Sequence, residues 1–318
     1  MNTIPTTFNQ HAIPYTLLGG RAFSSKGGGL DAIIMSRGGW YNFSSIVESL
    51  TKIGCTSIIS LESPNKSLDL ERMTCEYPKV KFLILQEKVS IGDGINIAMS
   101  EIKGDLAIVL WNEQSIVDEK LLLKALSQAK SSKRICTSPL LITKSNELLN
   151  NQMLPILENG HFYTIEAPAI QNGIRTVYAF DFSGIYNRTK FIEFGGFDYT
   201  ISNPYWQNLD FGFRSYLWGK EINISTHFKL KYLSSLPIED TSHDESYTRF
   251  YIKNLQPTIK DGKAYIGFDV FFSYLKSMGF NPFKAYKYFK IGRDWVHANE
   301  KRFKLSPYEL ISNWRILS

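Results

Sequence analysis

Short apolar runs alternate with amphipathic segments along the first part of the chain. The runs, each bounded by turn-forming residues, predict buried β-strands at residues 30–36, 56–62, 80–86 and 105–111. Between them, apolar residues at helical spacing predict helices at residues 46–53, 68–75 and 91–103. This alternation predicts an α/β fold with a mostly parallel sheet that is covered by helices on both faces. Ligands of such sheets bind at the carboxyl ends of the strands.

The pattern becomes less regular in the middle of the chain. It favours a helix at residues 118–130 and strands at residues 134–143 and 176–182. Residues 145–173 are weakly patterned, which is typical of a loop that covers a site.

A Gly-Gly turn at Gly195 and Gly196 precedes a marked amphipathic helix. The apolar stripe of this helix recurs at i, i+4, i+7 and i+8, and it consists of Leu209, Phe213, Tyr216 and Leu217. Asp210 and Arg214 lie one turn apart on a neighbouring face, where they can pair. Gly219 ends the helix.

Three regions of the chain differ in character. Residues 1–29 contain little periodicity and a Gly-rich run, so they predict an N-terminal arm. Residues 30–235 form the predicted main domain. From residue 236 a polar stretch leads into interleaved aromatic and basic residues, which predicts a small, mostly helical appendage at residues 236–318.

The appendage carries an aromatic and basic segment with two readings. Its members are Phe283, Lys284, Tyr286, Lys287, Phe289, Lys290 and Ile291. They could form a basic amphipathic surface for peripheral contact with a membrane or a lipid-linked acceptor. We favour the alternative, in which the aromatic residues pack onto the sheet domain and the lysines face water. No recognised nucleic-acid-binding module accompanies them, so no nucleic acid is expected.

Composition and charge limit the protein class only broadly. The 318 residues are 43% hydrophobic and 14% aromatic, enough for a substantial core. The net charge of +6 suits an anionic ligand, a membrane surface or nucleic acid. No apolar run approaches the roughly 18 residues of a membrane span, and no signal-peptide pattern is seen, so we expect a cytoplasmic protein, at most at the inner face of the membrane. Cys55, Cys75 and Cys136 are spaced like reduced thiols.

Several common phosphate-binding and metal motifs are excluded. The turn after the first strand, SRGGWYN, does not match the G-x-G-x-x-G of dinucleotide-binding proteins. Gly92 and Gly94 form a G-x-G at a helix start, but they follow the third strand and lack a third glycine. No GxxxxGK[ST] or HExxH sequence occurs.

Four ordered stretches resemble family 2 glycosyltransferases. DAIIMSRGGWYNFSSIVESL is similar to the first strand and helix of that family, and TSIISLES to its second strand. KVSIGDGINIAMSEIKGDLAIVLWNEQS is similar to the helix and strand that lead into the D-x-D motif. FGGFDYTISNPYWQNLDFGFRSYLWGKEI is similar to the acceptor-side segment. The resemblance covers about residues 31–233. It implies a GT-A fold and an inverting transfer of a sugar from a nucleotide donor to an acceptor. The acceptor would be a saccharide, a lipid-linked molecule or a protein of a cell-surface pathway.

The resemblance also implies a donor site. The matching positions are Ser36, Arg37, Glu62, Gly92, Asn96, Trp111 and Asn112. In this reading Glu62 contacts the base of a UDP-, GDP- or dTDP-linked sugar, and Arg37 lies beside the phosphates unless it is a solvated loop cation. Glu113 remains as the carboxylate of the D-x-D position and, with His243, is the candidate ligand of Mg²⁺ or Mn²⁺.

The acceptor side departs from the family pattern at Gln207 and Asn208, where the family has a Glu-Asp pair. Amides cannot take a proton from the acceptor hydroxyl, so the candidate catalytic carboxylates are Asp198 and Asp210. Both also have structural readings, Asp198 as a turn residue and Asp210 as a helix charge paired with its i+4 neighbour. Trp206 and Tyr205 would be a sugar platform or part of the core.

Two other protein classes remain as alternatives. A GT-A domain that has lost catalysis would act as a binding or scaffolding subunit, because most motif acids are missing. A nucleotidyltransferase shares the sheet type, but it would carry a Gly-rich loop with Lys and Arg early in the chain, which SRGGW matches poorly.

Overall fold

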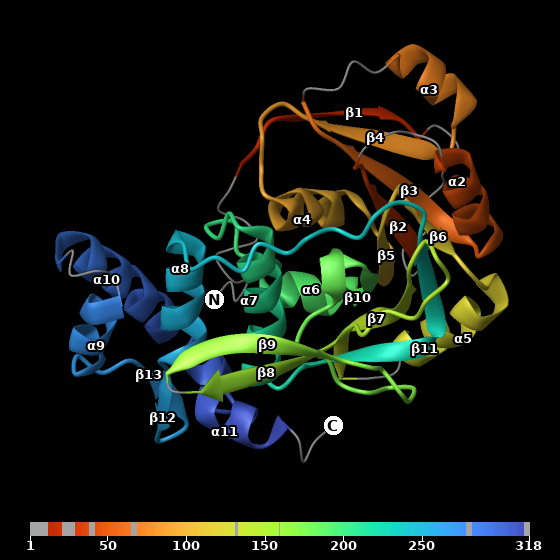
Figure 1. Cartoon of the computed structure of the whole chain (residues 1–318). Helices are drawn as coiled ribbons and strands as arrows, with labels where there is room; N and C mark the ends of the chain where they lie inside the picture. Colours follow the sequence, from red (N-terminus) through yellow and green to blue (C-terminus); the bar gives the residue numbers. More distant parts are fainter. Residues whose placement is uncertain are drawn as a thin grey trace.

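A nine-stranded mixed sheet forms the centre of the computed structural model, which describes residues 12–20, 29–37, 42–64, 69–130, 133–158, 160–277 and 282–314 (Figure 1). The strand order is β1-β4-β3-β2-β5-β10-β7-β11-β6. The strands are β1 (Tyr15–Gly19), β2 (Leu30–Met35), β3 (Cys55–Glu62), β4 (Val80–Leu85), β5 (Leu106–Trp111), β6 (Gln114–Ile116), β7 (Arg134–Ile142), β10 (Gly184–Asn187) and β11 (Glu221–Tyr232). Strands β4, β3, β2 and β5 are mutually parallel, which confirms the predicted α/β fold.

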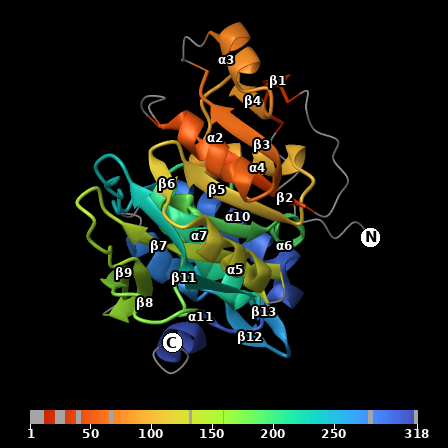
Figure 2. The same cartoon turned by 90° about the vertical axis from the view of Figure 1, so that its right-hand side faces the viewer.

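Helices cover both faces of this sheet. They are α2 (Phe43–Lys52), α3 (Leu70–Glu76), α4 (Ile91–Glu101), α5 (Glu119–Lys130), α6 (Arg188–Phe194) and α7 (Pro204–Leu217). Figures 1 and 2 show α2 and α5 on one face and α4 and α7 on the other. Every residue of β5 is buried, because this strand is covered on both sides. The predicted helices at residues 46–53 and 91–103 are therefore confirmed as α2 and α4.

Two predicted segments differ from the structure. Part of the expected N-terminal arm is β1, which pairs antiparallel with β4 at the edge of the sheet; residues 1–11 and 21–28 of that arm lie outside the described residues. The strand expected at residues 176–182 is wrong. Asp181 and Phe182 have positive φ angles of 52° and 59°, so the chain turns there, and the strand that follows is β10.

The weakly patterned residues 145–173 contain a β-hairpin instead of only a loop. Its strands are β8 (Gln152–Glu158) and β9 (His161–Ala167), which pair antiparallel. Phe162 on β9 packs edge-on against Phe213 of α7, with ring centres 5.4 Å apart. The hairpin thereby covers the outer side of α7, and its alternation was hidden by polar and charged positions on the exposed face.

The C-terminal segment is mostly helical, as expected, but it shares the core of the sheet domain. Its elements are α8 (Glu245–Leu255), β12 (Thr258–Lys260), β13 (Lys263–Tyr265), α9 (Val270–Ser277), α10 (Pro282–Ala298), η2 (Glu300–Arg302) and α11 (Pro307–Ser312). Phe250, Phe289 and Trp314 belong to the same apolar cluster as the sheet. Trp314 packs edge-on against Tyr216 of α7 at 4.7 Å.

Helix α10 presents aromatic residues on two sides. Ala285 and Phe289 are buried, whereas Phe283 and Tyr286 are exposed. Phe289 therefore packs in the core, as the packing reading expects, whereas Phe283 does not. The side chain of Lys284 lies outside the described residues. Within the described part of the chain, no helix combines the length and the apolar content that crossing a membrane requires.

Candidate functional site

Three neighbouring parallel strands end at the same level of the sheet. Met35 of β2 is in register with Leu61 of β3 on one side and with Trp111 of β5 on the other. The next residue along each strand is Ser36, Glu62 or Asn112. These three of the seven residues expected at the donor site therefore occupy equivalent positions at one carboxyl edge, where ligands of such sheets bind.

Arg37 is held at this edge by two carboxylates. Its Nη1 donates to Oε1 of Glu113 at 2.9 Å and to Oδ2 of Asp181 at 3.1 Å, and its Nη2 donates to Oδ1 of Asp181 at 2.8 Å. The guanidinium lies over the ring of Trp111, 3.6 Å from its centre. The backbone N–H of Arg37 donates to Oδ1 of Asn112 at 2.9 Å. Bidentate pairing and stacking together fix the orientation of the guanidinium plane.

A second layer of hydrogen bonds holds the two carboxylates. Tyr232 Oη donates to Oδ2 of Asp181 at 2.9 Å, and Ser234 Oγ donates to Oε2 of Glu113 at 2.6 Å. The indole N–H of Trp111 donates to the backbone carbonyl of Asp181 at 2.8 Å. This last bond fixes the left-handed turn that carries Asp181 to the edge. Sequence reasoning missed Asp181, because it lies inside the segment expected to be a strand.

The balance of burial and neighbouring charges raises the pKa values of both Arg37 and Asp181. Burial alone would lower the pKa of Arg37, but the carboxylates of Asp181 and Glu113 outweigh it and raise that pKa. For Asp181, burial outweighs Arg37, so its pKa is raised. The side chain of Arg37 is 31% exposed, against 16% for Glu113 and 6% for Asp181. The cation is thus the accessible member of the cluster.

A divalent cation does not fit the residues expected to hold it. Among the described residues, no group of three or more His, Cys, Asp or Glu side chains forms a metal site. Both oxygens of Glu113 already accept hydrogen bonds, one of them from a cation. His243 lies flat against Tyr247, with ring centres 3.9 Å apart, and burial lowers its pKa. The expected pair of Glu113 and His243 therefore lacks the free carboxylate oxygens that Mg²⁺ and Mn²⁺ prefer.

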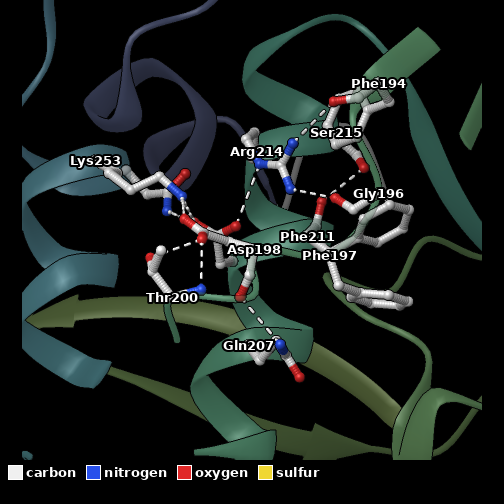
Figure 3. A network of polar contacts seen from close by, with 12 residues as sticks. Phe194, Gly196, Phe197, Asp198, Thr200, Gln207, Phe211, Arg214, Ser215 and Lys253 are labelled. Atoms are coloured by element: carbon white, nitrogen blue, oxygen red, sulfur yellow. Dashed lines mark hydrogen bonds and ion pairs between the residues drawn. The ribbon is translucent and has the colours of Figure 1, made fainter. Parts of the chain in front are cut away.

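The two carboxylates expected to be catalytic lie in a different, buried network. Lys253 of α8 forms ion pairs with Asp198 and with Asp210, the latter at 2.9 Å. Arg214 pairs with Asp210 at 3.2 Å, as the sequence predicted. Thr200 donates to Asp198 through its backbone N–H and its hydroxyl. Figure 3 shows Lys253 and Thr200 pointing toward Asp198.

This network fixes the Gly-Gly turn. Arg214 donates to the carbonyls of Phe194 and Gly196 at 3.1 and 2.8 Å, as Figure 3 shows. Burial alone would raise the pKa of Asp198, but Lys253 and the Thr200 hydrogen bonds lower it to about 2. Asp198 is 2% exposed and Asp210 is fully buried. Both carboxylates are ion-paired and anchor the turn. Among the described residues, no hydrogen bond joins either of them to the Arg37 cluster.

Helix α4 is joined to the same turn by amides. Asn96 Nδ2 donates to the carbonyl of Phe197 at 2.8 Å, and the N–H of Phe197 donates back to Asn96 Oδ1 at 2.9 Å. Gln207 accepts from the N–H of Gly92 at 2.8 Å and donates to Ser90 Oγ at 2.7 Å. The structure therefore places Gly92 and Asn96 at the turn, apart from the cluster around Arg37.

A cavity of about 540 Å³ lies between the β8–β9 hairpin, α7 and residues 236–243. Its lining includes Glu166, Tyr178, Tyr205, Trp206, Glu239 and His243. Tyr178 Oη donates to Oε2 of Glu239 at 2.6 Å. Burial raises the pKa of Glu239 to about 7; the hydrogen bond from Tyr178 opposes this shift, and the smaller effects of the Asp181 and Glu166 charges add to it. The effect of Asp181 links this cavity electrostatically to the Arg37 cluster. In the sequence, nothing distinguishes Glu239 from the other acids of its polar stretch.

No protein-family model matches the chain, and no curated protein matches it. Among solved structures, the fold is similar to that of GalNAc-T7 crystallised with UDP, GalNAc and Mn²⁺, with a TM-score of 0.54 and 13% identity over 72% of this chain and 51% of that one. The chain thus spans about half the length of GalNAc-T7. A structure of S. aureus TarS 1–349 in complex with UDP-GlcNAc matches with a TM-score of 0.49 and 11% identity, over 89% of this chain and 75% of that one. The sheet and its helices form an α/β fold like that of GT-A glycosyltransferases.

Proposed function

We propose that this protein transfers a sugar from a nucleotide donor to the hydroxyl of a saccharide-bearing acceptor. The observation that carries the proposal is the shared edge of β3, β2 and β5, where Glu62, Ser36 and Asn112 are aligned beside Arg37. The fold likeness to a protein crystallised with UDP and GalNAc supports it. In this proposal the nucleotide sugar binds at this edge, which recognises its base and its sugar, and the acceptor binds in the neighbouring cavity.

The donor side combines a cation with polar strand ends. The planar guanidinium of Arg37 suits the oxygens of a diphosphate, which it can bind with two parallel hydrogen bonds. Glu62 is buried at the end of β3 and accepts from Ser60 Oγ at 2.6 Å, which fixes its carboxylate. Because Glu62 is fully buried and Asn112 is 2% exposed, in this proposal they support the strand ends beside which the nucleoside binds. UDP-sugars are the first donors to test, followed by GDP- and dTDP-sugars.

The acceptor side is the 540 Å³ cavity with its aromatic wall. Tyr205 and Trp206 line this cavity but are only 5% and 1% exposed, so they form its packed wall, as the core reading expected, and not an open sugar platform. Glu239 takes the role of general base, which the sequence had suggested for Asp198 or Asp210, because it lies in the cavity whereas they are buried and ion-paired. The acceptor oxygen forms a bond to the anomeric carbon as the bond to the diphosphate breaks, and its proton passes to Glu239.

The test is turnover of a donor by the whole protein. UDP-, GDP- and dTDP-sugars are incubated with saccharide acceptors, and released nucleoside diphosphate is measured. We expect release with one donor class, and we expect Glu239→Gln to lose turnover while it still binds that donor. Absence of both binding and turnover for every nucleotide sugar would contradict the proposal.

The alternative of a binding subunit without catalysis has one observation in its favour. Gln207 and Asn208 replace the acids of the related motif, and both amides are buried and engaged in hydrogen bonds. A catalytically inactive subunit would bind a nucleotide but release no diphosphate under any condition. The same turnover experiment therefore separates the two functions.

A further inference from the structure

We propose that Arg37 supplies the positive charge that a divalent cation would otherwise supply to the donor diphosphate, so that donor binding needs no metal. This inference rests on the proposed function. It concerns the end of β5, where the family resemblance implied that Glu113 binds Mg²⁺ or Mn²⁺.

The guanidinium already occupies the space between the acidic groups. Oε1 of Glu113 and Oδ2 of Asp181 both accept from the same nitrogen, Nη1 of Arg37, at 2.9 and 3.1 Å. A metal ion that used these two oxygens would have to take the position of that nitrogen. It would also have to overcome repulsion from the guanidinium, whose pKa the carboxylates raise. The other oxygen of each carboxylate is bonded as well, to Ser234 and again to Arg37.

The outer side of Arg37 remains available. Contacts with described residues use three of the five N–H donors of the guanidinium, all three on Nη1 and Nη2. The side chain is 31% exposed. The Trp111 ring beneath it, at 3.6 Å, restricts its rotation, so little conformational entropy is lost when a phosphate binds.

The carboxylates oppose a dianionic ligand less than their number suggests. The side chain of Arg37 is 31% exposed, against 16% for Glu113 and 6% for Asp181, so the cation is the charge that a ligand arriving from solvent meets first. The negative charge that develops on the leaving diphosphate is balanced by a group fixed in place before the reaction, with no metal to recruit.

The inference is tested by calorimetric titration of the full-length protein with UDP, GDP and dTDP, once with excess EDTA and once with Mn²⁺. We expect one nucleotide to bind with the same affinity, within about twofold, in both conditions. Arg37→Gln should weaken that binding by about 10- to 100-fold, the range for loss of hydrogen bonds to a charged group. Arg37→Lys keeps the positive charge but loses the planar guanidinium, so its nucleotide affinity should lie between those of the wild type and Arg37→Gln.

Arg175→Gln is the matched control. Arg175 also pairs with a carboxylate, Glu221 at 3.1 Å, but Glu221 begins β11 whereas Tyr232, beside the Arg37 cluster, ends it. We expect this variant to bind nucleotide as the wild type does. Thermal unfolding of each variant, together with the intermediate affinity of Arg37→Lys, distinguishes lost binding from lost folding.

The opposite results are equally clear. Nucleotide binding that appears only with Mn²⁺, or that is unchanged by Arg37→Gln in EDTA, overturns the role of Arg37 and leaves the proposed function standing. Failure of all three nucleotides in both conditions overturns both. Tight Mn²⁺ binding to the wild type, seen by electron paramagnetic resonance and abolished by Glu113→Gln, would also refute the inference.

Discussion

The guanidinium carbon of Arg37 lies 3.6 Å from the centre of the Trp111 ring. Trp111 ends β5, and Arg37 lies two residues beyond the end of β2, its parallel neighbour in the sheet. The indole N–H of Trp111 also donates to the backbone carbonyl of Asp181, whose carboxylate accepts two hydrogen bonds from Arg37. One aromatic side chain thus positions both members of the ion pair. The predictions below begin from this arrangement.

Removing the guanidinium should create a metal site. In Arg37→Ala, Glu113 and Asp181 are left facing a common space, and carboxylate oxygens suit Mn²⁺. We expect Mn²⁺ to raise the melting temperature of this variant, by the equivalent of about 2.7 kcal/mol at 100 times its dissociation constant. The double variant Arg37→Ala/Glu113→Gln should not respond. An equal response of the wild type would show that the site already accepts metal.

Glu239 should set the pH dependence of transfer. Its pKa of about 7 in the folded protein, against an ordinary value of 4.5, means that the base form appears only as pH rises through 7. Initial rates should rise across that range, and Glu239→Gln should be inactive throughout. Asp240→Asn, which changes the exposed neighbouring acid, is the control. Its transfer rate should still increase as pH rises through 7.

The same shift predicts a change in stability with pH. Between pH 4.5 and about 7 the folded protein holds a proton on Glu239 that the unfolded chain releases, so the free energy of unfolding falls as pH rises. Glu239→Gln should be less sensitive to pH than the wild type over this interval, as measured by urea unfolding at several pH values. Parallel curves for the two proteins would argue against a raised pKa.

Lys253 should be essential for stability. Lys253→Met leaves Asp198 and Asp210 with one cation fewer in a buried network, which costs about 3–5 kcal/mol for a pair of this kind. Chemical denaturation measures the loss. The exposed pair of Lys263 and Glu300 provides the control, because Lys263→Met should cost less than about 1 kcal/mol. Adding Asp198→Asn to Lys253→Met should restore part of the stability.

The Gly-Gly turn offers a test of close packing. Gly196 and Gly262 both have positive φ angles, 64° and 72°, so alanine strains the backbone at either site. Only at Gly196 would a Cβ atom meet a neighbour, Asn96 Oδ1 at 2.3 Å, while the space at Gly262 is open. We expect Gly196→Ala to lose about 1–3 kcal/mol more than Gly262→Ala. Equal losses would mean that Asn96 moves aside without cost.

The sheet and the alignment of its strand ends could be predicted because their signals are local. The residues of β2, β3 and β5 form unbroken apolar runs, and parallel strands bring their carboxyl ends together whatever the loops do. Arg37 and Asn112 are hydrogen-bonded at this edge, and Glu62 stands at the end of the neighbouring strand β3. The pairing of Asp210 with Arg214 was equally visible, since one helical turn separates them.

The rest of the site depends on contacts between distant parts of the sequence. Lys253 reaches Asp210 from 43 residues away, and Tyr178 reaches Glu239 from 61 residues away, so periodicity carries no sign of either. Asp181 was hidden for another reason. The alternation around it resembles a strand, and only tertiary contacts, including the bond from Trp111, hold its backbone in the left-handed region.

Gln207 joins helix α4 to the Gly-Gly turn through three hydrogen bonds. Its amide accepts from Gly92 with one atom and donates to Ser90 and to the carbonyl of Asp198 with the other, a combination that an ionised carboxylate cannot make. An amide also has no proton to gain or lose in the physiological range. The hydrogen bonds that Gln207 makes between α4 and the Gly-Gly turn therefore do not change with pH. A change of pH near 7 alters the charge of Glu239 without altering these contacts.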